Sequence, residues 1–173
     1  MKYLILIIIF LGFIITPAFA QEVNSSLIIE NMEIPAEKFN TVLRNAPIIP
    51  LDNIHSVSWQ ITIDNNLLYA NPDGNAVFRV YDKLDNSEFI EVGMGPKPDN
   101  KFWVAVQTPD EGYIVVHSDL DRGWYPQAKS IVSFTDRAGL TVNNGARIVV
   151  TNLDIGQFEI ESYSVYGMQG STD

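Results

Sequence analysis

The side chains in this sequence that could bind a ligand are concentrated in one stretch. Trp103, His117, Trp124 and Tyr125 lie between residues 100 and 126. Flat aromatic faces next to polar groups hold sugar rings by stacking and directional hydrogen bonds. We therefore take these four residues as candidate ligand-binding residues. For Trp124 there is an alternative: a loop tryptophan can also plug the open end of a two-layer β-fold, in which case its ring is part of the core.

Acidic residues follow His117 closely, and they raise the question of a metal ion. Asp119 and Asp121 offer carboxylate oxygens, the ligand type that calcium prefers. The segment lacks the pattern of a twelve-residue calcium loop, and aspartate is also common in turns that bind no ion. A structural calcium ion at this pair is the one cofactor that the sequence suggests.

Residues that could catalyse a reaction are few. Glu159 and Glu161 lie two apart on a predicted strand, which puts them ~7 Å apart on one face, near the spacing that glycosidases use. The apolar residues Phe158 and Ile160 alternate with them, which favours an ordinary solvated face. There is no His-Glu-x-x-His motif, no Gly-x-Ser-x-Gly motif and no cysteine. We predict a non-catalytic protein and rank a glycosidase third.

The first twenty residues predict export. Lys2 precedes an apolar run from Leu4 to Ile15, and Ala18-Phe19-Ala20 provides a small-residue cleavage site before Gln21. This is the pattern of a secretory signal peptide. The alternative is a retained membrane anchor, for which the apolar segment is barely long enough. We expect the chain to work extracellularly, in a periplasm or at a cell surface, without contacting a membrane unless this segment is retained.

Charge and composition narrow the partners. The formal net charge is −10, so the surface repels nucleic-acid backbones and anionic lipid headgroups. The absence of cysteine means that packing and backbone pairing must stabilise the fold without disulfides. Cations, neutral glycans and basic proteins remain as electrostatically compatible partners.

Alternation of apolar and polar residues predicts the elements that position these side chains. From residue 55 the period is two, and about ten short strands are separated by turn residues such as Asn143-Asn144-Gly145. This spacing favours a single antiparallel β-sandwich, jelly-roll-like, in an all-β chain. The predicted divisions are a signal peptide (1–20), an N-terminal strand and short helical or irregular arm (21–50), the sandwich (51–167) and a flexible tail (168–173).

Two functional hypotheses follow from these observations. The first is an exported binding domain for a glycan or a cell-envelope component. The second is a structural or adhesive envelope protein that self-assembles through sheet edges or through apolar residues of the arm, such as Leu27–Ile29.

Overall fold

A computed structural model of the protein describes residues 48–51, 56–64, 74–83 and 87–169. Within these ranges the chain is built of strands, and no helix is present. The predicted signal peptide, the arm up to residue 47, the segment 65–73 and the end of the tail lie outside the described residues. The strands are β1 (Ile49–Pro50), β2 (Ser58–Asp64), β3 (Gly74–Asp82), β4 (Phe89–Met94), β5 (Phe102–Thr108), β6 (Gly112–Asp119), β7 (Lys129–Thr135), β8 (Gly139–Asn144), β9 (Arg147–Leu153) and β10 (Ile160–Gln169).

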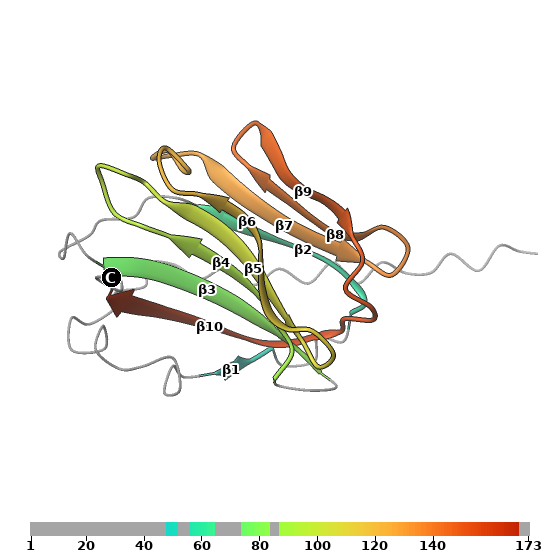
Figure 1. The fold of residues 1–173 in the computed structure, drawn as a ribbon. Helices are drawn as coiled ribbons and strands as arrows, with labels where there is room; N and C mark the ends of the chain where they lie inside the picture. Colours follow the sequence, from blue (N-terminus) through green and yellow to red (C-terminus); the bar gives the residue numbers. More distant parts are fainter. Residues whose placement is uncertain (1–47, 52–55, 65–73, 84–86, 170–173) are drawn as a thin grey trace, which may run out of the picture.

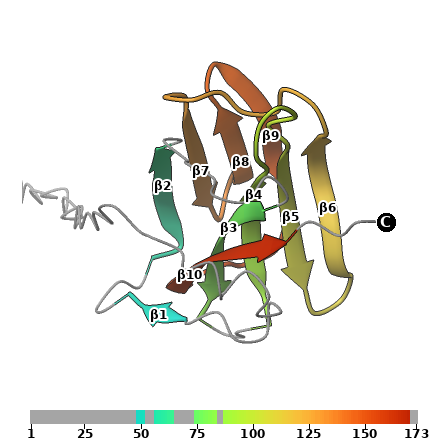
Figure 2. The same cartoon turned by 90° about the vertical axis from the view of Figure 1, so that its left-hand side faces the viewer.

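The strands form two antiparallel sheets that pack as a sandwich (Figures 1 and 2). Sheet A has the order β1-β10-β3-β4-β5-β6, and sheet B has the order β2-β7-β8-β9. Consecutive strands form hairpins within each sheet, whereas β10 returns to pair with β3 and β2 pairs with β7. Such long-range returns are typical of Greek-key and jelly-roll chains. The predicted all-β antiparallel sandwich is confirmed.

The hydrophobic core lies between the sheets and is formed by alternate residues of each strand. Val104 of β5, Val132 of β7 and Leu140 of β8 are at most 1% exposed. On β2, Trp59, Ile61 and Ile63 pack against this core while the intervening residues are exposed, as period-two alternation predicts. Burying each such apolar side chain contributes about 1.5–3 kcal/mol to stability.

Turn chemistry explains the connections between neighbouring strands. Asn143-Asn144-Gly145 leads from β8 into β9, and Gly145 has a φ of 60°, which glycine adopts at little cost. Gly112, with a φ of 73°, begins β6 after the β5–β6 turn. The turn predicted at Asn143-Asn144-Gly145 is therefore formed, and β5 and β6 form a second hairpin.

The ends of the sandwich differ from the predicted boundaries. Ile49 and Pro50, predicted to be part of the arm, form β1 and pair with β10. At the other end β10 continues to Gln169, which pairs with Gly74, so the first residues of the predicted tail belong to sheet A.

No helix within the described ranges has the length and apolar character to cross a membrane.

An irregularity in β6 changes which way its side chains face. Val104 pairs with His117 but Ala105 pairs with Val115, so the residue between them forms a β-bulge. Strict alternation would put His117 on the face of Val115. The bulge instead turns His117 toward the core side, where its ring lies 6.2 Å from the ring of Phe102.

Candidate functional site

The outward face of sheet A carries a set of aromatic rings, and Trp103 of β5 is one of them. Trp103 pairs with Gly93 of β4. A Cβ atom on Gly93 would lie 1.9 Å from Cε2, 1.9 Å from Cζ2 and 2.4 Å from Cη2 of the indole. Because the three ring atoms are at similar distances from this hypothetical Cβ atom, the Cβ position lies under the face of the ring and not at its edge. The indole therefore lies flat on the sheet, in space that only a glycine leaves free.

The carboxylate of Glu91 holds this ring and its neighbours in place. Glu91 Oε1 accepts hydrogen bonds from Trp103 Nε1 at 2.8 Å and from Tyr113 Oη at 2.8 Å. Its Oε2 accepts from Arg79 Nε at 2.6 Å and from Tyr166 Oη at 3.4 Å. Because one carboxylate receives donors from β3, β5, β6 and β10, it fixes the side chains of four strands around β4.

Burial determines the electrostatics of this cluster. Glu91 is 2% exposed and Arg79 is 9% exposed, and Arg79 Nη2 lies 2.6 Å from Glu91 Oε2. The guanidinium also lies 3.8 Å from the ring centre of Phe89 and 5.4 Å from that of Tyr166. Burial, the largest single influence, lowers the pKa of Arg79, but the charge and hydrogen bond of Glu91 together with the nearby Tyr166 and Tyr81 raise the pKa overall. The pair is a satisfied buried ion pair.

The tyrosine hydroxyls of the cluster stay protonated. Burial, and then the charge of Glu91, raise the pKa of both Tyr113 and Tyr166 well above the ordinary value of tyrosine. Both hydroxyls therefore remain donors to the carboxylate.

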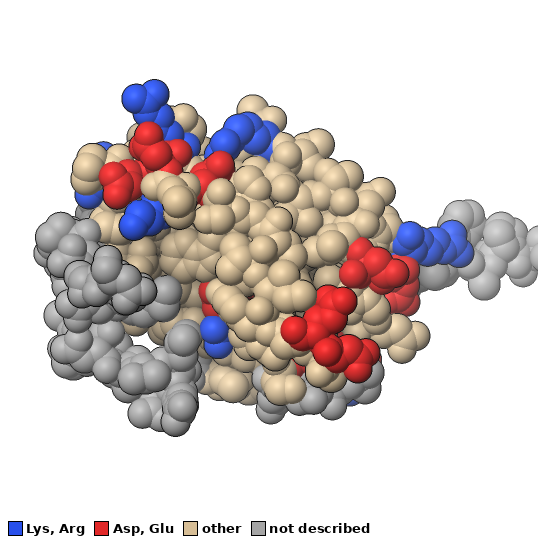
Figure 3. All heavy atoms as spheres, viewed as in Figure 1, with Lys and Arg blue, Asp and Glu red and all other residues tan. Residues whose placement is uncertain are grey.

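The outward face becomes more exposed toward the β6 edge. Tyr166 of β10 and Phe89 of β4 are 5% and 9% exposed, Trp103 is partly exposed, and Tyr113 of β6 is 48% exposed. Figure 3 looks onto this side of the molecule: charged atoms gather toward the two ends, and the middle, over β4 to β6 in the view of Figure 1, is mostly uncharged. The more exposed part of this face thus carries aromatic rings and is mostly uncharged.

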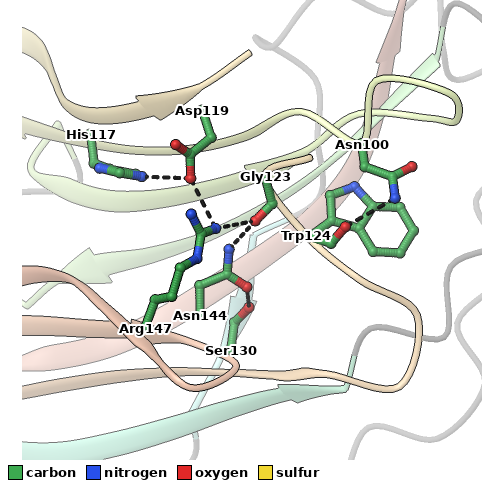
Figure 4. A network of polar contacts seen from close by, with 8 residues as sticks. All are labelled: Asn100, His117, Asp119, Gly123, Trp124, Ser130, Asn144 and Arg147. Atoms are coloured by element: carbon green, nitrogen blue, oxygen red, sulfur yellow. Dashed lines mark hydrogen bonds and ion pairs between the residues drawn. The ribbon is translucent and has the colours of Figure 1, made fainter. Parts of the chain in front are cut away.

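Trp124, predicted as a ligand residue, is part of the core. Its side chain is 1% exposed, and its Nε1 donates a hydrogen bond to the Gly95 carbonyl at 2.7 Å. Asn100 Nδ2 donates to the carbonyl of Trp124 at 3.0 Å (Figure 4). This is the core-plug alternative, and the indole has no free face for stacking. Tyr125, the next residue, is 55% exposed in the loop between β6 and β7.

His117 and Asp119 lie in a network that joins the two sheets at one edge of the sandwich (Figure 4). Asp119 Oδ2 lies 3.1 Å from His117 Nε2 and 3.0 Å from Arg147 Nη2 of β9. Arg147 Nη2 also donates to the Gly123 carbonyl at 2.7 Å, which accepts a second bond from Asn144 Nδ2. We call His117, Asp119, Gly123, Asn144 and Arg147 the edge network. It ties the β6–β7 loop to sheet B.

The two candidate calcium ligands, Asp119 and Asp121, have different surroundings in the structure. Arg147, a cation, contacts the carboxylate of Asp119 and repels a metal ion there. Asp121 is directed to solvent, with its side chain 72% exposed and its Oδ2 3.9 Å from Arg122 Nε. Within the described ranges no three His, Asp or Glu side chains converge to hold a metal. Burial raises the pKa of Asp119, but the His117 hydrogen bond and the Arg147 charge outweigh it and lower the pKa overall.

The two glutamates considered for glycosidase chemistry are also accounted for by ordinary surface structure. Glu159 Oε1 lies 3.3 Å from Lys83 Nζ, and both side chains are partly exposed to solvent. Glu161 lies where the pairing of β10 with β3 shifts register.

Sequence reasoning included Trp103 but missed Glu91, Arg79 and Tyr113. A signal for the first two was present. Arg79 and Glu91 are single charges within two apolar strands predicted to form a hairpin, and they pair directly. Opposite charges at facing positions of a hairpin indicate a cross-strand ion pair.

The comparisons with known proteins assign no family. No family model matches the chain, and no solved structure gives a significant match.

Proposed function

We propose that this chain is an exported, non-catalytic binding domain for a glycan, and that the glycan stacks on Trp103 and Tyr113 on the outward face of sheet A. The observation that carries the proposal is the flat indole of Trp103 over Gly93, anchored by the bond to Glu91. A ring fixed in this way loses little entropy on binding, because its rotamer is already set. Tyr113 shares the same anchoring oxygen and adds a second, half-exposed ring.

Charge and export support the same proposal. A net charge of −10 disfavours nucleic acids and anionic membranes but leaves glycans as partners. The signal-peptide pattern of residues 1–20 would deliver the domain to a location where envelope glycans occur.

The test is glycan binding by a Trp103→Ala variant. The variant should bind about tenfold more weakly, because a stacked aromatic contact is worth ~0.5–1.5 kcal/mol beyond the area that it buries. Binding is measured by calorimetry on a glycan first identified with an array of the unmodified chain. Ile148→Ala is the matched control, since Ile148 is an apolar residue of sheet B that is 65% exposed. Equal affinity of Trp103→Ala and the unmodified chain would contradict the proposal.

A second candidate function, self-assembly in a cell envelope, is favoured by the β6 edge. Strand β6 is the last strand of sheet A, and Tyr113, Ile114 and Val115 are 48%, 36% and 49% exposed. Neither lysine nor proline interrupts β6, although such residues commonly protect an edge from pairing. This edge could add a strand from a neighbouring copy.

Size in solution distinguishes the two functions. Self-assembly predicts a mass that rises with concentration in sedimentation equilibrium, and an Ile114→Lys variant that stays monomeric because a charge now lies on the edge. A monomer at every concentration up to the millimolar range would exclude edge pairing and leave the glycan-binding proposal standing.

A further inference from the structure

The outward-facing side chains of the last two strands of sheet A are all uncharged. Pairing of β5 with β6 places Trp103 opposite Ser118, Ala105 opposite Val115 and Gln107 opposite Tyr113. We call these six residues the β5–β6 face. Ser118, Val115 and Tyr113 are exposed, Gln107 and Trp103 are partly exposed, and Ala105 is buried beneath its neighbours.

The charges closest to this face are either neutralised or at its border. Arg79 and Glu91 lie on the same side of sheet A, but they pair with each other and are buried. Lys101, two residues before Trp103 on the same side by alternation, is exposed at the end of the loop that enters β5. An anionic ligand on the β5–β6 face would have to obtain its countercharge from Lys101.

The polar groups that remain on the face are neutral hydrogen-bonding groups. Gln107 carries an amide, which both donates and accepts, and Ser118 carries a hydroxyl with the same capacity. They lie at opposite ends of the face, and each is next to one ring: Ser118 is opposite Trp103 and Gln107 is opposite Tyr113. Such groups match sugar hydroxyls and offer no charge to a carboxylate or a sulfate.

We infer that the ligand class of this site is a neutral polysaccharide with flat sugar rings, that is, one whose hydroxyls are equatorial and whose axial C–H groups can lie on an aromatic face. The inference rests on the proposed function and narrows it. Flat rings suit the flat indole of Trp103, and neutrality suits a face without free charge. A uronate or a sulfated glycan would lose its hydration against this apolar surface without gaining an ion pair there.

The experiment compares two sets of probes on the full chain. Hydroxyethyl cellulose and xylan represent neutral, flat, β-linked chains, and polygalacturonate and a sulfated galactan represent anionic ones. Affinity electrophoresis and calorimetry should detect binding to a neutral probe and at least tenfold weaker binding to the anionic ones. Affinity for the neutral probe should change less than twofold between 0.05 and 0.5 M salt, because no ion pair is involved.

Three variants test the residues. Gln107→Ala should weaken binding of the neutral probe about threefold to tenfold, an effect of the size expected for one lost hydrogen bond. Lys101→Gln should leave it unchanged. Trp103→Phe keeps an aromatic ring and should therefore retain more affinity than Trp103→Ala. If a tryptophan variant unfolds, Gln107→Ala still tests the site, because we expect its melting temperature to be unchanged.

The outcomes separate the inference from the proposed function. If the chain preferred an anionic probe, and if high salt or Lys101→Gln abolished that binding, the inference that the ligand is neutral would be wrong. The proposed stacking role of Trp103 would still stand. Binding to neither set of probes, nor to any glycan on the array, would overturn the proposed function itself.

Discussion

Replacing Trp124 with alanine should lower the free energy of unfolding by about 3–5 kcal/mol, the cost of removing a large buried aromatic side chain. Its indole is 1% exposed, packs in the core and donates to the Gly95 carbonyl. The variant therefore leaves a cavity and also leaves the carbonyl of Gly95 without this donor. Urea denaturation followed by circular dichroism measures the loss, which is a large part of the stability of an ordinary domain.

Tyr125→Ala provides the matched control for this variant. Tyr125 is the neighbouring aromatic residue and is 55% exposed, so its removal should change stability by about 0.5 kcal/mol or less. A Trp124→Ala variant as stable as Tyr125→Ala would show that the indole lies outside the core, and it would restore Trp124 as a candidate for stacking.

Replacing Glu91 with alanine should lower the free energy of unfolding by a similar amount, but by a different mechanism. The change leaves Arg79 buried without its countercharge, and breaking a buried pair in this way commonly costs about 3–5 kcal/mol. It also removes the acceptor of the Trp103 and Tyr113 side chains. Thermal and urea unfolding report the stability loss, and intrinsic tryptophan fluorescence, compared with that of the same change in a Trp103→Phe background, reports the altered surroundings of the Trp103 ring.

The double variant Arg79→Met/Glu91→Leu distinguishes the cost of leaving a buried charge unpaired from the cost of losing the hydrogen bonds to Trp103 and Tyr113. Because it removes both charges and keeps comparable volume, it should recover most of the stability that Glu91→Ala loses. It should not recover glycan affinity, because the rings of Trp103 and Tyr113 are still without their anchor. A double variant as unstable as Glu91→Ala would show that the hydrogen bonds to the rings, and not the unpaired guanidinium, account for the loss.

The strands and the hairpins between neighbouring strands were predictable because their physical causes are local, whereas the pairing of β10 with β3 and of β2 with β7 was not. Apolar residues on β2 recur at every second position, and turn residues such as Gly145 mark where the chain reverses. A sandwich follows from that pattern, although β4 in the middle of sheet A is buried on both of its faces. The burial of Trp124 was also foreseen as one of two alternatives, since a loop between two sheets can end in either environment.

The parts that sequence reasoning missed depend on contacts between distant segments. A bulge in β6 puts His117 on the opposite face from the one that strict alternation predicts. The local sequence does not show that a strand contains one extra residue. The partner of Asp119 is Arg147, which belongs to the other sheet, so an aspartate that suggested a metal ion proved to be part of an ion pair. The role of Glu91 was missed because its four donors come from four different strands.

The position of β10 has a consequence for the time course of folding. This last strand lies between β1 and β3, and Gln169 pairs with Gly74. The pairing of β10 with β3 therefore cannot be completed until residue 169 has been synthesised, and the loop-closure entropy of this long-range pairing must be overcome first. Until then the edge of β3 is bare and open to pairing with other chains. We expect folding in milliseconds to seconds, as is usual for high-contact-order β-proteins, and a chain cut before β10 should aggregate instead of folding.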